Sequence, residues 1–153
     1  MVDHMDSPIT LGHIQVASLD TYPSRGEPED PRWEVTYSGR NEDGCWHVLG
    51  GLLLSDEYSV ATIVLQAHID EDSDDGPLSE EDFRKAITAD DYILTTLYRR
   101  ARHTALVLVG LAESDIEVPL YVEPDIASDE ERVTQRQALI EQMRAENDEH
   151  EAS

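Results

Sequence analysis

The stretch that decides the fold is residues 91–112, which read DYILTTLYRRARHTALVLVGLA. Apolar residues recur in it every three or four positions, the spacing that places them on one side of an α-helix. We therefore predict a long helix with one buried face. The predicted apolar stripe consists of Leu94, Leu97, Tyr98, Ala101, Ala105, Leu108 and Ala112.

Arg99, Arg100 and Arg102 give this helix a positive band within a very acidic chain. The 153 residues include 34 aspartates and glutamates but only 11 lysines and arginines, for a formal net charge of −23. Such a band needs anionic neighbours, which its own fold or a second copy can supply.

The acid excess limits the ligands that the chain can take. It argues against nucleic acid, which needs a basic footprint, and against anionic membrane surfaces. The charge is spread along the whole chain, which favours adaptation to a high-salt habitat over mimicry of a nucleic acid, and both readings stay open. Cys45 is the only cysteine, which predicts a reducing, cytoplasmic location, and we expect neither a signal peptide nor a membrane span.

The residue pattern before the long helix predicts an antiparallel sheet with one solvent-exposed face. Apolar and polar residues alternate in it, most clearly around Ile63. A phase change near Gly12 predicts a bulge, and residues 41–44 predict a hairpin turn. The predicted strands are residues 9–19, 33–38, 45–54 and 58–69.

Three further elements complete an α+β fold. A short helix begins after Ser79 and ends near Ile87, and a last helix runs from the capping box at residues 128–131 to about Asn147. Residues 116–123 are extended, and Pro119 and Pro124 exclude a central strand there. The prediction is a four-stranded antiparallel sheet packed by the long helix, with a proline-bearing crossover and a C-terminal helix. Residues 9–146 form one domain between a flexible 1–8 and an acidic tail, 147–153.

No pattern predicts catalysis, a metal or a cofactor. Residues 70–81 approach a calcium loop, but Asp75 stands where that loop requires glycine. His47, His68 and His103 are isolated in sequence, and Cys45 has no catalytic motif around it, although folding could bring it to a histidine. We therefore predict a protein that is not an enzyme.

The apolar residues exceed what one sheet face under one helix needs. The surplus predicts either a subunit interface or a groove for an extended apolar segment of another chain. The candidate groove residues are Trp46, Leu52, Leu54, Val60, Val64, Ile116, Val118, Leu120 and Val122.

The order of the elements resembles that of the SecB export chaperones. Leu97-Tyr98-Arg99-Arg100 is similar to the Pro-Tyr-x-Arg that opens the main SecB helix, with leucine in place of proline. Residues 116–124, IEVPLYVEP, look like the proline-containing SecB crossover, and the resemblance extends from about Ile9 to Met143.

The resemblance implies a homotetramer, a dimer of dimers with helices at the interface, and ATP-independent holding of unfolded proteins. The implied interface residues are Tyr98, Arg100, Arg102 and Ala105. A SecA-like motor is the implied docking partner, and an antitoxin is an alternative client, since some SecB relatives chaperone antitoxins. A non-catalytic acidic interaction protein stays the competing hypothesis.

Overall fold

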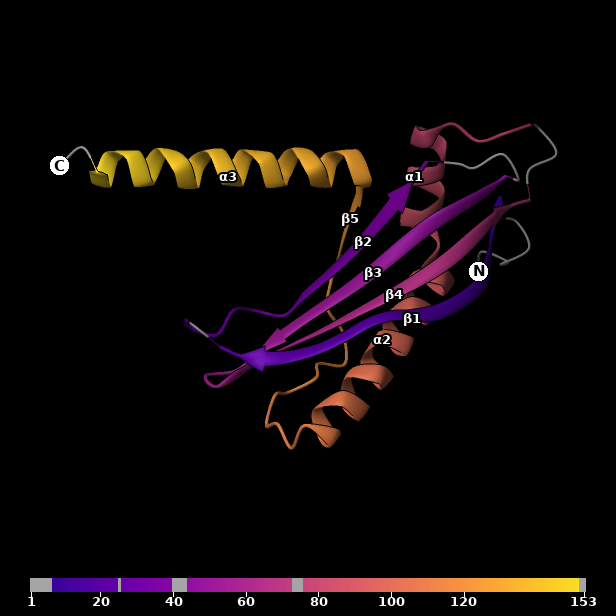
Figure 1. Ribbon diagram of the computed structural model, residues 1–153. Coiled ribbons are helices and arrows are strands. Elements are labelled where there is room, and N and C mark those ends of the chain that lie inside the picture. Colours follow the sequence, from indigo (N-terminus) through magenta and orange to yellow (C-terminus); the bar gives the residue numbers. More distant parts are fainter. Residues whose placement is uncertain (1–6, 25, 40–43, 73–75, 152–153) are drawn as a thin grey trace.

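The computed structural model describes residues 7–24, 26–39, 44–72 and 76–151 (Figure 1). Most of the predicted hairpin turn, residues 41–43, and residues 1–6 of the predicted N-terminus lie outside this part. The elements are β1 (Ile9–Pro23), β2 (Arg32–Ser38), β3 (Cys45–Ser55), β4 (Ser59–Glu71), α1 (Glu80–Ala89), α2 (Asp91–Leu111), β5 (Pro124–Ser128) and α3 (Asp129–Glu151).

The strands form one mixed sheet in the order β1-β4-β3-β2-β5. The first four are antiparallel, as predicted, and a register shift between Leu11 and Ile14 confirms the bulge. The prediction of a sheet with only four strands is wrong, because β5 pairs parallel to β2. Pro124 is the first residue of β5, and a proline at a strand start or at a sheet edge removes no ladder hydrogen bond.

One face of the sheet is covered and the other is open. Every second residue along β2, β3 and most of β4 is buried, and the residues between are at least partly exposed. Helices α1 and α2 supply the cover (Figure 1). On α1, Phe83 stacks on Trp46 with ring centroids 4.1 Å apart and packs beside Tyr37.

Helix α2 is capped at its N-terminus by Asp90, which the sequence analysis did not identify as a cap. The Asp90 carboxylate accepts a hydrogen bond from the Ile93 N–H at 3.0 Å, which satisfies one free donor of the first turn. The buried stripe is shifted slightly from the prediction: Ile93 and Val109 belong to it, whereas Ala112 is exposed. The remaining buried residues of α2 are Leu97, Tyr98, Ala101 and Ala105.

Helix α3 leaves the β5 edge of the sheet and projects away from the body (Figure 1). It is fastened in its first turns, where Arg132 donates to the Asp125 carboxylate, the Asp125 carbonyl and Thr36 Oγ1. The helix runs to Glu151, so residues 147–151 of the predicted acidic tail are helical. No helix in the described part of the chain is both long and apolar enough to cross a membrane.

Candidate functional site

The candidate site is a pocket between α2 and the segment that leads into β5. Its volume is about 250 Å³. Aromatic and aliphatic side chains line it, with Asp91, Thr95 and Arg99 as its polar members. The other lining residues are Trp33, Leu94, Tyr98, Leu120, Tyr121, Val122 and Pro124.

Three aromatic rings run through the pocket from the core to the surface. Trp33 is buried and packs edge-on against Tyr98, with ring centroids 5.5 Å apart. Tyr98 in turn meets the ring of Tyr121 at 6.5 Å. Burial raises the pKa of the Tyr98 phenol, and the nearby Arg102 guanidinium partly offsets that rise. The phenol therefore keeps its proton and acts as a donor at neutral pH.

Trp33 has its place because the facing strand carries glycine. A Cβ added at Gly50 would lie 2.5 Å from Trp33 Cη2, closer than any real contact. The indole therefore lies directly against the β3 backbone, where it lines the pocket. The signal in the sequence is Gly50-Gly51, because glycines within a strand permit a bulge or a close approach of other atoms.

Two large apolar side chains stand exposed at the mouth of the pocket. Leu120 is 81% exposed and the adjacent Tyr121 is 69% exposed. Water-exposed aliphatic and aromatic surface gains free energy when another chain covers it, at roughly 25 cal/mol per Å². The mouth of the pocket is therefore suited to an apolar partner.

The predicted groove residues do not form one surface. Trp46, Leu52 and Leu54 are buried on the covered face of the sheet. Phe83 of α1 stacks on Trp46, whereas the prediction had assigned the cover to one helix alone. Val60 and Val64 alternate with those buried positions and lie on the open face. Of the crossover residues, Ile116 is buried and Val118 is half-buried against the core, whereas Leu120 and Val122 line the pocket.

The residues that the resemblance placed at a subunit interface are also divided. Tyr98 and Ala105 are buried within the chain itself, and Arg102 is half-buried. Arg100 is exposed, as are Leu106 and Val107 one to two turns further along α2. Tyr98 and Arg102 therefore act within the chain, and Arg100 alone of the four remains fully available to a partner.

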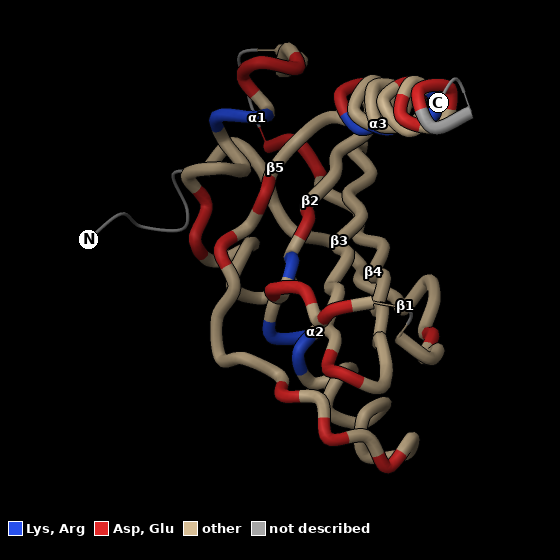
Figure 2. The backbone as a smooth tube through the Cα atoms, turned by 90° about the vertical axis from the view of Figure 1, so that its left-hand side faces the viewer, with Lys and Arg blue, Asp and Glu red and all other residues tan. Residues whose placement is uncertain are grey.

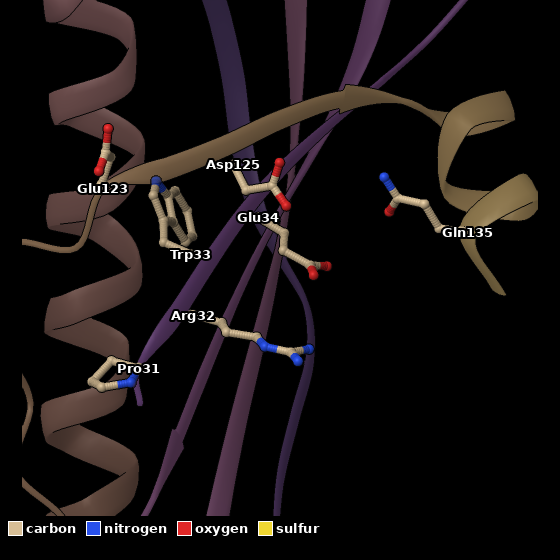
Figure 3. Close-up of a pocket in the computed structure, with 7 residues that line it drawn as sticks. All are labelled: Pro31, Arg32, Trp33, Glu34, Glu123, Asp125 and Gln135. Atoms are coloured by element: carbon tan, nitrogen blue, oxygen red, sulfur yellow. The ribbon is translucent and has the colours of Figure 1, made fainter. Parts of the chain in front are cut away.

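A larger and more open hollow, of about 400 Å³, lies between β2, β5 and α3. Figure 3 shows Arg32 and Glu34 pointing toward Gln135 of α3, while Trp33 points to the other side of β2, toward α2. Glu123 and Asp125 add two more carboxylates to this hollow. Because it is charged and open, it offers an apolar segment no cover, and we take the smaller aromatic pocket as the candidate site.

The open face of the sheet brings together residues that are isolated in sequence. His47 and His68 lie opposite each other on β3 and β4, with ring centroids 4.6 Å apart. Cys45 Sγ lies 3.5 Å from His68 Nδ1, so folding does bring the cysteine to a histidine. Within the described ranges no three histidine, cysteine or acidic side chains are arranged to hold a metal ion. Asp74 of the calcium-like loop lies outside those ranges.

Among comparisons with known proteins, only the comparison with solved structures finds a similar protein. No protein-family model and no curated protein matches the sequence. Among solved structures, the chain is similar to the Mycobacterium tuberculosis SecB-like chaperone Rv1957, in complex with a ChAD peptide from the Rv1956 HigA1 antitoxin. The TM-score is 0.59 at 15% sequence identity, over 76% of this chain and 88% of that chain. The chain therefore has the fold of a SecB-like chaperone.

Proposed function

We propose that this protein is a holdase chaperone that binds extended or unfolded polypeptides without ATP. The observation that carries the proposal is the exposed pair Leu120 and Tyr121 at the mouth of an aromatic pocket. Burial of apolar surface is non-directional, so such a site tolerates many client sequences. No reaction, metal or cofactor enters the proposal.

The structural neighbour supports a polypeptide client, because it was solved with an antitoxin peptide. For this chain an antitoxin is one client class within the proposal, and a protein awaiting export, handed to a SecA-like motor, is the other. The two client classes differ in whether a translocation motor binds the loaded chaperone.

Aggregation of an unfolded test protein provides the experiment. We expect near-stoichiometric amounts of the purified protein to suppress light scattering from a diluted, chemically unfolded substrate, with no nucleotide present. An equally acidic folded protein of similar size serves as the control. Light scattering equal to that measured with the control protein would contradict the proposed holdase function.

We also propose that copies associate through the outer face of α2. Arg100 is exposed there, as is Val107 about two turns further along the same side of the helix, and the acidic surfaces of a second copy can pair with the arginine. Multi-angle light scattering at low and high salt tests this, with a mass near four chains as the expected result. A mass of one chain at both salt concentrations would rule it out.

A further inference from the structure

The Pro119 carbonyl, just before the exposed Leu120, accepts two hydrogen bonds from α2. Tyr98 Oη donates at 2.7 Å and Arg102 Nε donates at 3.2 Å. The two donors are four residues apart, so they lie one above the other on the same side of the helix. One acceptor in an irregular segment is thus held from two successive turns.

The crossover needs this support because its own backbone cannot supply it. Pro119 has no N–H, and residues 117–122 belong to no strand. Among the described residues, the two bonds at Pro119 are the hydrogen bonds that join residues 117–122 to the rest of the chain. Val118 and Val122 pack against the core on either side, yet Leu120 between them is exposed. The outward position of Leu120 therefore coincides with the anchored carbonyl.

We infer that Tyr98 and Arg102 are positioning residues of the proposed groove, which fix the Pro119 carbonyl and so hold Leu120 and Tyr121 outward at the pocket mouth. The Tyr98 ring also packs between Trp33 and Tyr121, so one side chain supports both the floor and the mouth. This inference rests on the proposed function, because it names what orders the client-binding side chains. Without the two donors, the segment samples conformations in which the pair is turned toward the core, and binding must first restore the open arrangement.

The test removes each donor while keeping its packing. Tyr98→Phe keeps the ring, and Arg102→Met keeps the aliphatic stem that covers neighbouring side chains. Arg102→Lys restores a charged donor. Tyr37→Phe, in the same sheet, controls for loss of a buried hydroxyl, and Arg144→Met, on α3, controls for loss of one charge.

Two readouts are compared: amide hydrogen exchange at residues 120–122 without client, and affinity for an unfolded test substrate. We expect each donor-removing variant to exchange at least about threefold faster at these amides and to bind about three- to tenfold more weakly. Arg102→Lys should recover part of both effects, and the two controls should match the native chain. Melting curves confirm that each variant is folded.

The outcomes separate this inference from the proposed function. Unchanged amide exchange at residues 120–122 in both donor-removing variants would overturn the inference, regardless of the measured affinity for the unfolded substrate. Faster exchange with unchanged affinity would also overturn it, because the anchored carbonyl would then not order the groove. A native chain that binds no unfolded substrate would instead overturn the proposed function.

Discussion

Gly50 is the residue that leaves room for the Trp33 indole, which lines the pocket. Trp33 lies against its backbone, and the nearest Trp33 atom is 2.5 Å from where a Cβ would be placed. A Cβ added at the adjacent Gly51 would meet no heavy atom within 4 Å, so the two glycines differ in environment although they are neighbours. They offer a matched pair of substitutions.

Gly50→Ala should lower the free energy of unfolding by about 1–3 kcal/mol, because the added methyl displaces a buried indole in a packed core. The displaced indole should also narrow the pocket and weaken client binding. Chemical denaturation followed by tryptophan fluorescence measures the first effect. Gly51→Ala is the control and should be close to neutral. Equal losses from the two substitutions would contradict the close contact at Gly50.

At the scale of elements, the turn between β3 and β4 is built around one carboxylate. Asp56 Oδ1 accepts the N–H groups of Tyr58 and Ser59, each at 2.8 Å. These backbone hydrogen bonds, the one from Tyr58 first, lower the pKa of Asp56 below its usual value. A carboxylate whose pKa is lower in the folded state adds stability above its unfolded pKa and loses it as pH falls through the folded pKa.

Asp56→Asn should therefore be less stable than the native chain near neutral pH, because a neutral amide oxygen is a weaker acceptor than a carboxylate. The difference should shrink from about pH 5 downward, as Asp56 of the native chain becomes protonated. Denaturation midpoints of both proteins across this range give the difference directly. A difference that stays constant with pH would show that the charge of Asp56 has no part in the turn.

Helix α3 is held to the body in its first turns, where Glu131 pairs with Arg84 of α1 and Arg132 is the main anchor. The Arg132 side chain is only 11% exposed and makes three hydrogen bonds to β2 and β5, whereas the side chains described from Thr134 onward are exposed. Most of the stability of a helix in a protein comes from tertiary packing, and α3 has little packing beyond these contacts. Arg132→Met should therefore lose part of its ellipticity at 222 nm below the main melting transition, while Arg144→Met on the same helix should not. Identical melting curves would show that α3 is stable without its anchor.

Local patterns predicted the elements well, because alternation and helical spacing depend on a few neighbouring residues. The pairing of β5 with β2 escaped prediction because it joins residues far apart in the chain. Leu120 was predicted for the groove and lines the pocket, but its alternation with Val118 and Val122, which are partly buried, did not predict that it would be exposed. Trp46 was assigned to a groove because nothing in the sequence indicated that Phe83 would cover it.

For the whole molecule, the net charge of −23 is a general property and marks no site. Figure 2 shows aspartates and glutamates distributed over helices, strands and connecting loops. A mimic of nucleic acid needs its acids ordered along one face, so this distribution favours the high-salt interpretation.

The melting temperature should rise as potassium chloride increases from about 0.1 to 1 M, because the screening length falls from about 10 to 3 Å and self-repulsion weakens. Sucrose at matched osmolality controls for effects that do not involve charge. A melting temperature that stays flat or falls with salt would show that repulsion does not limit the folded state.

The most direct test of the central claim is the affinity for an unfolded test substrate after removal of one exposed tyrosine. Tyr121 at the pocket mouth and Tyr58 in the β3–β4 turn are 69% and 80% exposed, so either can be lost without disturbing the core. We predict that Tyr121→Ser weakens binding at least about fivefold, the effect of losing a residue that contributes about 1 kcal/mol or more to an interface. Tyr58→Ser should bind as the native chain does. Equal affinities for the two variants would contradict a client site at this pocket.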